Sequence, residues 1–115
     1  MILFHAYRGE ELVVGSVDYL APRAVEEIMN AEATHARRQL ERLARSARGA
    51  RVRVSTLVAE GPAAAAIVNV AKTKRANLVV LGTHGRTGVQ RFLIGSVAER
   101  VVRTAPCPVL VSGPP

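Results

Sequence analysis

The stretch from Leu78 to Gly88, LVVLGTHGRTG, decides the fold. It begins with four consecutive apolar residues, Leu78-Val79-Val80-Leu81, which are typical of a central parallel strand covered on both faces. A polar, glycine-rich loop follows from Gly82 to about Phe92, and Gly95-Ser96 then opens another apolar segment. Ligands of open α/β sheets bind beyond the carboxyl ends of the strands. The loop therefore leaves its strand at the edge where a binding site is expected.

Outward from this stretch, strand-like and helix-like segments alternate along the whole chain. Apolar, β-branched runs predict strands at 2–7, 51–58, 78–81 and 107–111. Apolar residues that recur every three or four positions predict helices at 22–47, at 63–74, and from 97 to just before Pro106. The first helix is expected to bury Val25, Ile28, Met29, Ala36, Leu40, Leu43 and Ala47, and the second Ile67, Val70 and Ala71.

Local signals place the ends of these elements. Pro22 suits the first turn of the long helix, and Gly49 is expected to end it. Ser96 and Glu99 have the spacing of a capping box, which predicts a helix starting at Val97. Pro108 lacks a backbone donor and so places the last strand at or near a sheet edge.

The order β-α-β-α-β-α-β defines the expected fold class. Parallel strands need right-handed crossover connections, so we expect a three-layer α/β/α fold with a mainly parallel sheet and four strands in the chain. The length of 115 residues suits one domain spanning residues 1–115.

Composition narrows the functional classes. No apolar run approaches the roughly 20 residues that a membrane span needs, and no signal peptide is recognised at the start, so we expect a cytoplasmic protein without membrane contact. The single cysteine, Cys107, fits a reducing compartment, and between two prolines it is expected to be buried and inert. A formal net charge of +7 favours anionic ligands, although 14 of the 16 basic residues are arginine, an excess that a GC-rich genome also produces.

The glycine-rich segment has the chemistry of a phosphate cradle. Glycines permit a close approach of a ligand to backbone N–H groups, and the helix that Gly95-Ser96 opens favours an anion at its start. Arg86 adds a fixed positive charge. A purely structural loop is the alternative reading, and Ser96 is explained equally well as a helix cap.

The spacing Gly82-x2-Gly85-x9-Gly95-Ser96, together with His84 and the strand Pro106-Cys107-Pro108-Val109-Leu110-Val111, closely resembles the universal stress protein family. The resemblance implies a flavodoxin-like, or adenine nucleotide α-hydrolase-like, sheet. In one branch of the family it also implies bound ATP, with Mg²⁺ if the nucleotide is present. The nucleotide-binding residues that it implies are Ala6, Gly82, Thr83, His84, Gly85, Arg86, Gly95, Ser96 and Val97.

The same resemblance implies a homodimer that pairs its last strands through Pro108, Val109, Leu110 and Val111. It also points to a departure, because family members begin with a strand and a helix that precede the strand resembled by 2–7. That first β-α unit, whose strand carries an acidic residue that helps to hold the nucleotide, is not present in these 115 residues.

Three functions remain open from the sequence. The first is an ATP-binding stress-response module that acts through ligand-dependent dimer or partner contacts. The second is a dimeric interaction protein with a vestigial glycine loop. The third is nucleic-acid binding by the arginines of 37–53. It ranks below the simpler interpretation that these arginines form a solvent-exposed helix face. Catalysis and a metal centre are not expected, since no nucleophile elbow, P-loop or metal-ligand spacing occurs, but slow ATP hydrolysis stays open.

Overall fold

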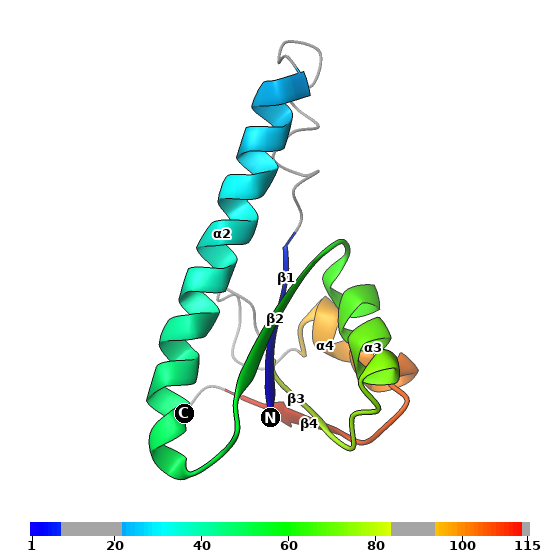
Figure 1. Cartoon of the computed structure of the whole chain (residues 1–115). Helices are drawn as coiled ribbons and strands as arrows, with labels where there is room; N and C mark the ends of the chain where they lie inside the picture. Colours follow the sequence, from blue (N-terminus) through cyan, green and yellow to red (C-terminus); the bar gives the residue numbers. More distant parts are fainter. Residues whose placement is uncertain (8–21, 84–93, 114–115) are drawn as a thin grey trace. The chain divides into compact units, whose positions relative to one another are not determined.

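The computed structural model describes residues 1–7, 22–83 and 94–113 (Figure 1). Within these ranges strands and helices alternate as expected: β1 (Ile2–Tyr7), α2 (Pro22–Ala47), the 3₁₀ turn η1 (Arg48–Ala50), β2 (Ser55–Glu60), α3 (Ala63–Thr73), β3 (Val79–Gly82), α4 (Ser96–Thr104) and β4 (Val109–Ser112). The predicted α/β class is confirmed. No helix in the described ranges is long and apolar enough to cross a lipid bilayer.

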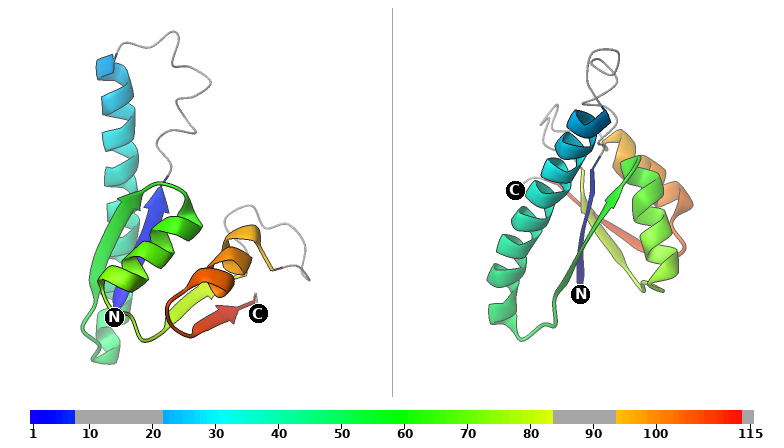
Figure 2. Two further views of the ribbon diagram at one scale, coloured as in Figure 1. Left: turned by 90° about the vertical axis from the view of Figure 1, so that its right-hand side faces the viewer. Right: turned by 45° about the horizontal axis from the view of Figure 1, so that its top comes forward.

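The chain divides into two compact units, Met1–Ala63 and Ala64–Pro115. In the first, β1 and β2 pair in parallel, from Ile2 opposite Ser55 to Tyr7 opposite Glu60. Helix α2 lies along both strands (Figures 1 and 2) and buries Ala33, Ala36, Leu40 and Ala44. The small alanine side chains let the helix backbone approach the strand pair closely.

The long helix differs in two details from its predicted form. Leu43, expected in the apolar stripe, is 59% exposed, because the buried face is centred on Leu40 and Ala44 instead. The helix ends at Ala47 as predicted, but Gly49 is not the residue that terminates it: Gly49 lies within η1, and the left-handed conformation falls on Arg51, with φ of 58°.

The strand predicted at 51–58 begins later, at Ser55. Its ladder with β1 opens where the Ser55 N–H donates to the Met1 carbonyl at 3.0 Å. Residues 51–54 pair with no strand in the described part of the chain.

In the second unit, β3 and β4 pair in parallel, from Val79 opposite Val109 to Gly82 opposite Ser112. The buried residues of this unit are Ala64 and Ala71 of α3 and Ala98 and Val101 of α4, and α4 contacts β4. The predicted positions Ile67 and Val70 are only half-buried, since α3 turns its alanines inward instead.

The four predicted strands thus form two parallel pairs, β1-β2 and β3-β4. We expected the strand at 78–81 to be covered on both faces, but Val80 is 60% exposed and its registered neighbour Leu110 is 55% exposed. Among the described residues, β4 is the single strand that pairs with β3. Within the second unit, no described element covers the side of the pair that carries Val80 and Leu110, so this unit alone does not supply the predicted coverage.

Candidate functional site

The two ends of the glycine-rich segment are tied together at the carboxyl end of β3. The Thr83 N–H donates to the Ser112 carbonyl at 2.9 Å and so extends the ladder with β4 by one bond. The Thr83 carbonyl in turn accepts a hydrogen bond from the Gly95 N–H at 2.7 Å. The start of α4 is therefore held directly beside the end of β3.

Gly95 is the N-cap of α4, with φ of −60° and ψ of 154°. These angles suit any residue, so the glycine is not required by its conformation. It is required by space, because a Cβ atom at this position would lie 2.5 Å from the Thr83 carbonyl oxygen. A residue with a side chain would separate the helix from the strand end and open the cradle.

The start of α4 differs from its predicted form. Ser96 is the first helical residue rather than the cap, and the N-cap residue, Gly95, has no side chain that could make a capping bond. The Glu99 carboxylate instead accepts a hydrogen bond from the Arg103 guanidinium group at 2.6 Å, so it does not form the expected capping box with Ser96. The Glu99 N–H donates to the Gly95 carbonyl at 3.0 Å, and the N–H groups before it have no acceptor within the helix.

This geometry suits an anion in chemical terms. The first-turn N–H groups and the positive end of the helix dipole favour a negatively charged ligand at the start of α4. Ser96 adds an exposed hydroxyl group there, and Val97 is also exposed beside it. The close approach that Gly95 permits brings the exposed Gly82 to the same edge of the unit.

The structure locates the candidate residues as follows. Gly82, Thr83, Gly95, Ser96 and Val97 are brought together by the bonds at the end of β3. Ala6 lies half-buried on β1, in the other unit. His84, Gly85 and Arg86 lie outside the described residues.

The expected dimer strand is β4, which runs from Val109 to Ser112 rather than over 107–111. Pro108 precedes it, and its carbonyl accepts from the Val79 N–H at 3.0 Å. Backbone groups of a parallel strand face its neighbours alternately, so those of Val109 and Val111 point away from β3. No described strand pairs with that edge. Cys107, predicted buried, is a free thiol of intermediate exposure.

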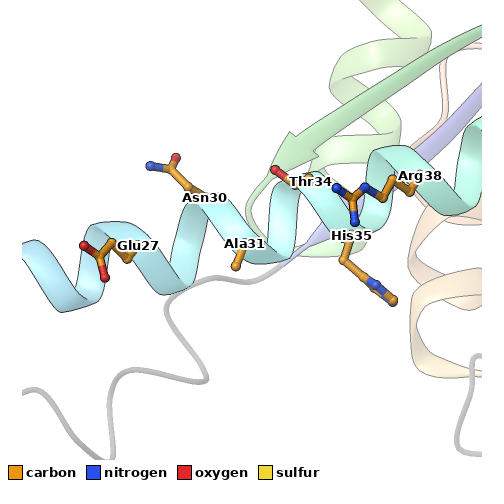
Figure 3. A pocket seen from close by; sticks show the side chains of 6 residues that line it. All are labelled: Glu27, Asn30, Ala31, Thr34, His35 and Arg38. Carbon is orange, nitrogen blue, oxygen red and sulfur yellow. The ribbon is translucent and has the colours of Figure 1, made fainter.

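A hollow along α2 escaped the sequence reasoning, which treated this helix surface as solvated. It is lined by Glu27, Asn30, Ala31, Thr34, His35 and Arg38. His35 Nε2 lies 2.9 Å from Gln39 Nε2. In Figure 3 the Asn30 and His35 side chains point to opposite sides of the helix, so the polar groups do not converge on one ligand. The spacing of three and four residues between them was the sequence signal that could have grouped these side chains along the helix surface.

Comparison with known proteins identifies relatives along nearly the whole chain. The model of the universal stress protein family matches residues 5–112. Universal stress protein YxiE of Bacillus subtilis is 32% identical over 108 residues, which cover 90% of this chain and 73% of that protein. Universal stress protein MJ0531 of Methanocaldococcus jannaschii is 53% identical over 60 residues, which cover 52% of this chain and 35% of that protein.

Solved structures show the same fold. Hypothetical protein MJ0577 of Methanocaldococcus jannaschii superposes with a TM-score of 0.84 at 25% identity, covering 99% of this chain and 75% of that one. A universal stress protein in complex with cAMP superposes with a TM-score of 0.51 at 20% identity, covering 97% and 71%, and this likeness concerns the fold alone. The chain thus spans about three quarters of the relatives that it matches along most of its length.

Proposed function

The chain belongs to the universal stress protein family, and from that premise we propose that it is an adenine-nucleotide-binding module of a stress response. The observation that carries the proposal is the bond from the Gly95 N–H to the Thr83 carbonyl, at 2.7 Å. It places the anion-favouring start of α4 against the carboxyl end of β3, the edge where α/β sheets bind their ligands.

The nucleotide phosphates fit this corner on chemical grounds. The first-turn N–H groups of α4 and the Ser96 hydroxyl would donate to phosphate oxygens at the edge formed by the close approach of Gly95 to Thr83. Mg²⁺, bound with ATP, would neutralise part of the phosphate charge. Family resemblance also implies nucleotide contacts for Thr83, His84, Gly85, Arg86 and Val97 in this unit, and for Ala6 in the other unit. The family resemblance, which implies bound ATP in one branch, supports the choice of an adenine nucleotide.

We assign this module a binding role in the cytoplasm without catalysis. The sequence motifs that supply a general base or an activated nucleophile are not recognised in the chain. Binding of ATP would then act by changing contacts with a second copy or with a partner. A turnover assay with radiolabelled ATP tests this part of the proposal, and phosphate release that Ser96→Ala abolishes would contradict it.

Isothermal titration with ATP and Mg²⁺ tests the binding itself. We expect saturable heat and a rise in Tm at millimolar ATP, since a ligand that binds only the folded chain stabilises it. Ser96→Asp should weaken binding at least tenfold, because a carboxylate at the helix start repels phosphate while it suits the helix dipole and preserves the fold. Asn77→Asp makes the same charge change at an exposed position outside the site and should leave the affinity unchanged.

Two results would overturn the proposal. One is a titration without heat or Tm shift at millimolar ATP. The other is an equal loss of affinity in Ser96→Asp and Asn77→Asp, which would mean that net charge rather than the α4 corner governs binding.

A second candidate function rests on the open edge of β4. Val109 and Val111 present backbone groups that no described strand covers, and such an edge pairs readily with another strand. A homodimeric interaction protein with a vestigial loop would use this edge and ignore ATP. Sedimentation velocity with and without ATP separates the two functions, because a dimer that forms equally in both conditions favours the second.

A further inference from the structure

The positive charge of the chain is concentrated in one short segment. Residues 37–53, hereafter the arginine segment, contain seven of the 16 basic residues and one of the nine acidic residues. The rest of the chain carries nine basic against eight acidic residues and is almost neutral. The formal charge of +7 is therefore a property of one surface and not of the whole molecule.

All seven arginines of the segment are exposed. Arg38, Arg42 and Arg45 are spaced by four and three residues, so they lie on one face of α2, away from the buried Leu40 and Ala44. Of the remaining members, Arg37 lies on another side of α2, and three follow the helix: Arg48, Arg51 and Arg53.

The start of β1 lies beside the segment. The backbone nitrogen of Met1 donates a hydrogen bond to the Arg53 carbonyl at 2.8 Å. Figure 1 shows the start of β1 and the end of α2 at the same end of the first unit, and Figure 2 agrees. Most arginines of the segment therefore gather at this end of the unit.

One carboxylate, Glu41, lies within the segment, and among the described residues it forms no ion pair with the arginines. In the parts of the chain that the structure describes, the one ion pair is Glu99 with Arg103, far along the sequence from the segment. The helix dipole explains a basic residue in the last turn of α2, such as Arg45. It does not explain Arg38, about two turns before Arg45, or Arg53, which lies beyond the helix.

We propose that the arginine segment binds the phosphate backbone of duplex DNA without reading its sequence. Guanidinium groups pair with phosphate oxygens through two hydrogen bonds, which suits repeated phosphate contacts. From Arg38 to Arg48 the segment extends for about 15 Å at 1.5 Å per residue, the span of roughly four phosphates on one strand. The major groove of B-DNA, about 12 Å wide, admits a helix beside those phosphates.

Three other anionic partners fit this surface less well. Single-stranded nucleic acid is bound largely through stacking on aromatic side chains, and aromatic residues make up only 3% of this chain. A helix that lies on an anionic membrane inserts an apolar face, whereas the apolar face of α2 is buried against β1 and β2. Duplex RNA has a narrow major groove that a helix does not enter.

Fluorescence anisotropy with a labelled 25-base-pair DNA duplex tests the proposal on the full chain. At 50 mM salt we expect a Kd of about 10⁻⁶ M, weakening by a factor of 10² to 10³ at 200 mM as counterions are released. The triple variant Arg38→Gln, Arg42→Gln, Arg45→Gln should lose at least tenfold in affinity, and its salt slope should fall by about three units. The triple lysine variant at the same positions keeps the charge and should retain most of that slope.

The matched control is Arg23→Gln, Lys72→Gln, Arg75→Gln, which removes the same charge from exposed positions outside the segment. We expect it to change the affinity less than threefold. Thermal melting of each variant confirms that the fold is kept. Absence of binding at 50 mM salt, equal losses in the two glutamine triples, or tighter binding to duplex RNA or to anionic lipid vesicles would each overturn the proposal.

Discussion

The Gly95 N–H donates to the Thr83 carbonyl oxygen at 2.7 Å, and that same oxygen would lie 2.5 Å from a Cβ atom on residue 95. One atom therefore both holds the start of α4 and excludes a side chain from it. The hydrogen bond therefore requires a glycine at position 95, because the two backbones can approach this closely only where no Cβ atom lies between them.

Gly95→Ala should destabilise the chain by about 1–3 kcal/mol, since the added methyl group forces α4 away from the end of β3. Urea denaturation measures the loss. Gly113→Ala is the control in the same unit, because no atom lies within 4 Å of a Cβ built there, and it should be close to neutral. Equal stability of the two variants would contradict the geometry of the cradle.

Val101→Ala should cost about 2–3 kcal/mol, because it removes two buried carbon atoms and leaves a cavity. Val101 has no exposed surface, whereas its neighbour Val102 is 51% exposed. Val102→Ala makes the same chemical change on the outer side of α4 and should cost less than about 0.5 kcal/mol. Thermal melting of the pair tests this assignment of the core of the second unit.

Sequence periodicity predicted the helices and strands well, because the spacing of apolar residues differs between a helix and a strand. It located β1, α2 and α3 nearly to the residue. It could not distinguish Leu43 from Ala44 as the buried member of the α2 stripe, since both fit the helical period and only close packing against β1 and β2 selects the smaller side chain. It also could not foresee that Arg103 takes the Glu99 carboxylate from the expected capping box.

The site was predictable only in part, for a physical reason. The glycines and Ser96 indicated that two backbone segments approach closely. They could not indicate the acceptor, because the Thr83 carbonyl is a backbone group that every residue carries. The exposed face of β3 and β4 could not be predicted either. An apolar run such as Leu78 to Leu81 predicts that a strand should be covered, and the run does not say which residues cover it.

Gly61 offers a separate test in the first unit. Its φ is +127°, and its N–H donates to the Tyr7 carbonyl at 2.9 Å, extending the pairing beyond the end of β2. Gly61→Ala should cost about 1–3 kcal/mol, because residues with a side chain rarely adopt this conformation. Gly49→Ala, where no atom lies within 4 Å of the added Cβ, should be neutral or stabilise by up to about 1 kcal/mol. Chemical denaturation that ranks these two variants in the opposite order would contradict the turn geometry.

The outward edge of β4 supports the last prediction, which concerns assembly. The carbonyls of Pro108 and Ser112 accept bonds from β3, so the alternation of a parallel strand turns the N–H group of Val111 to the opposite edge. Val111→Pro removes that donor without removing a bond to β3, and a strand at an edge tolerates proline. If two copies pair through this edge, we expect Val111→Pro to be monomeric in sedimentation velocity.

Leu110→Pro is the matched control for that experiment, because the N–H of Leu110 points toward β3. It should lower Tm more than Val111→Pro does, since it removes a bond within the unit and not at its edge. A dimer that persists in Val111→Pro would show that another surface pairs the copies. In that case the next residues to substitute are Val80 and Leu110, because they lie exposed on a face that α/β folds normally cover.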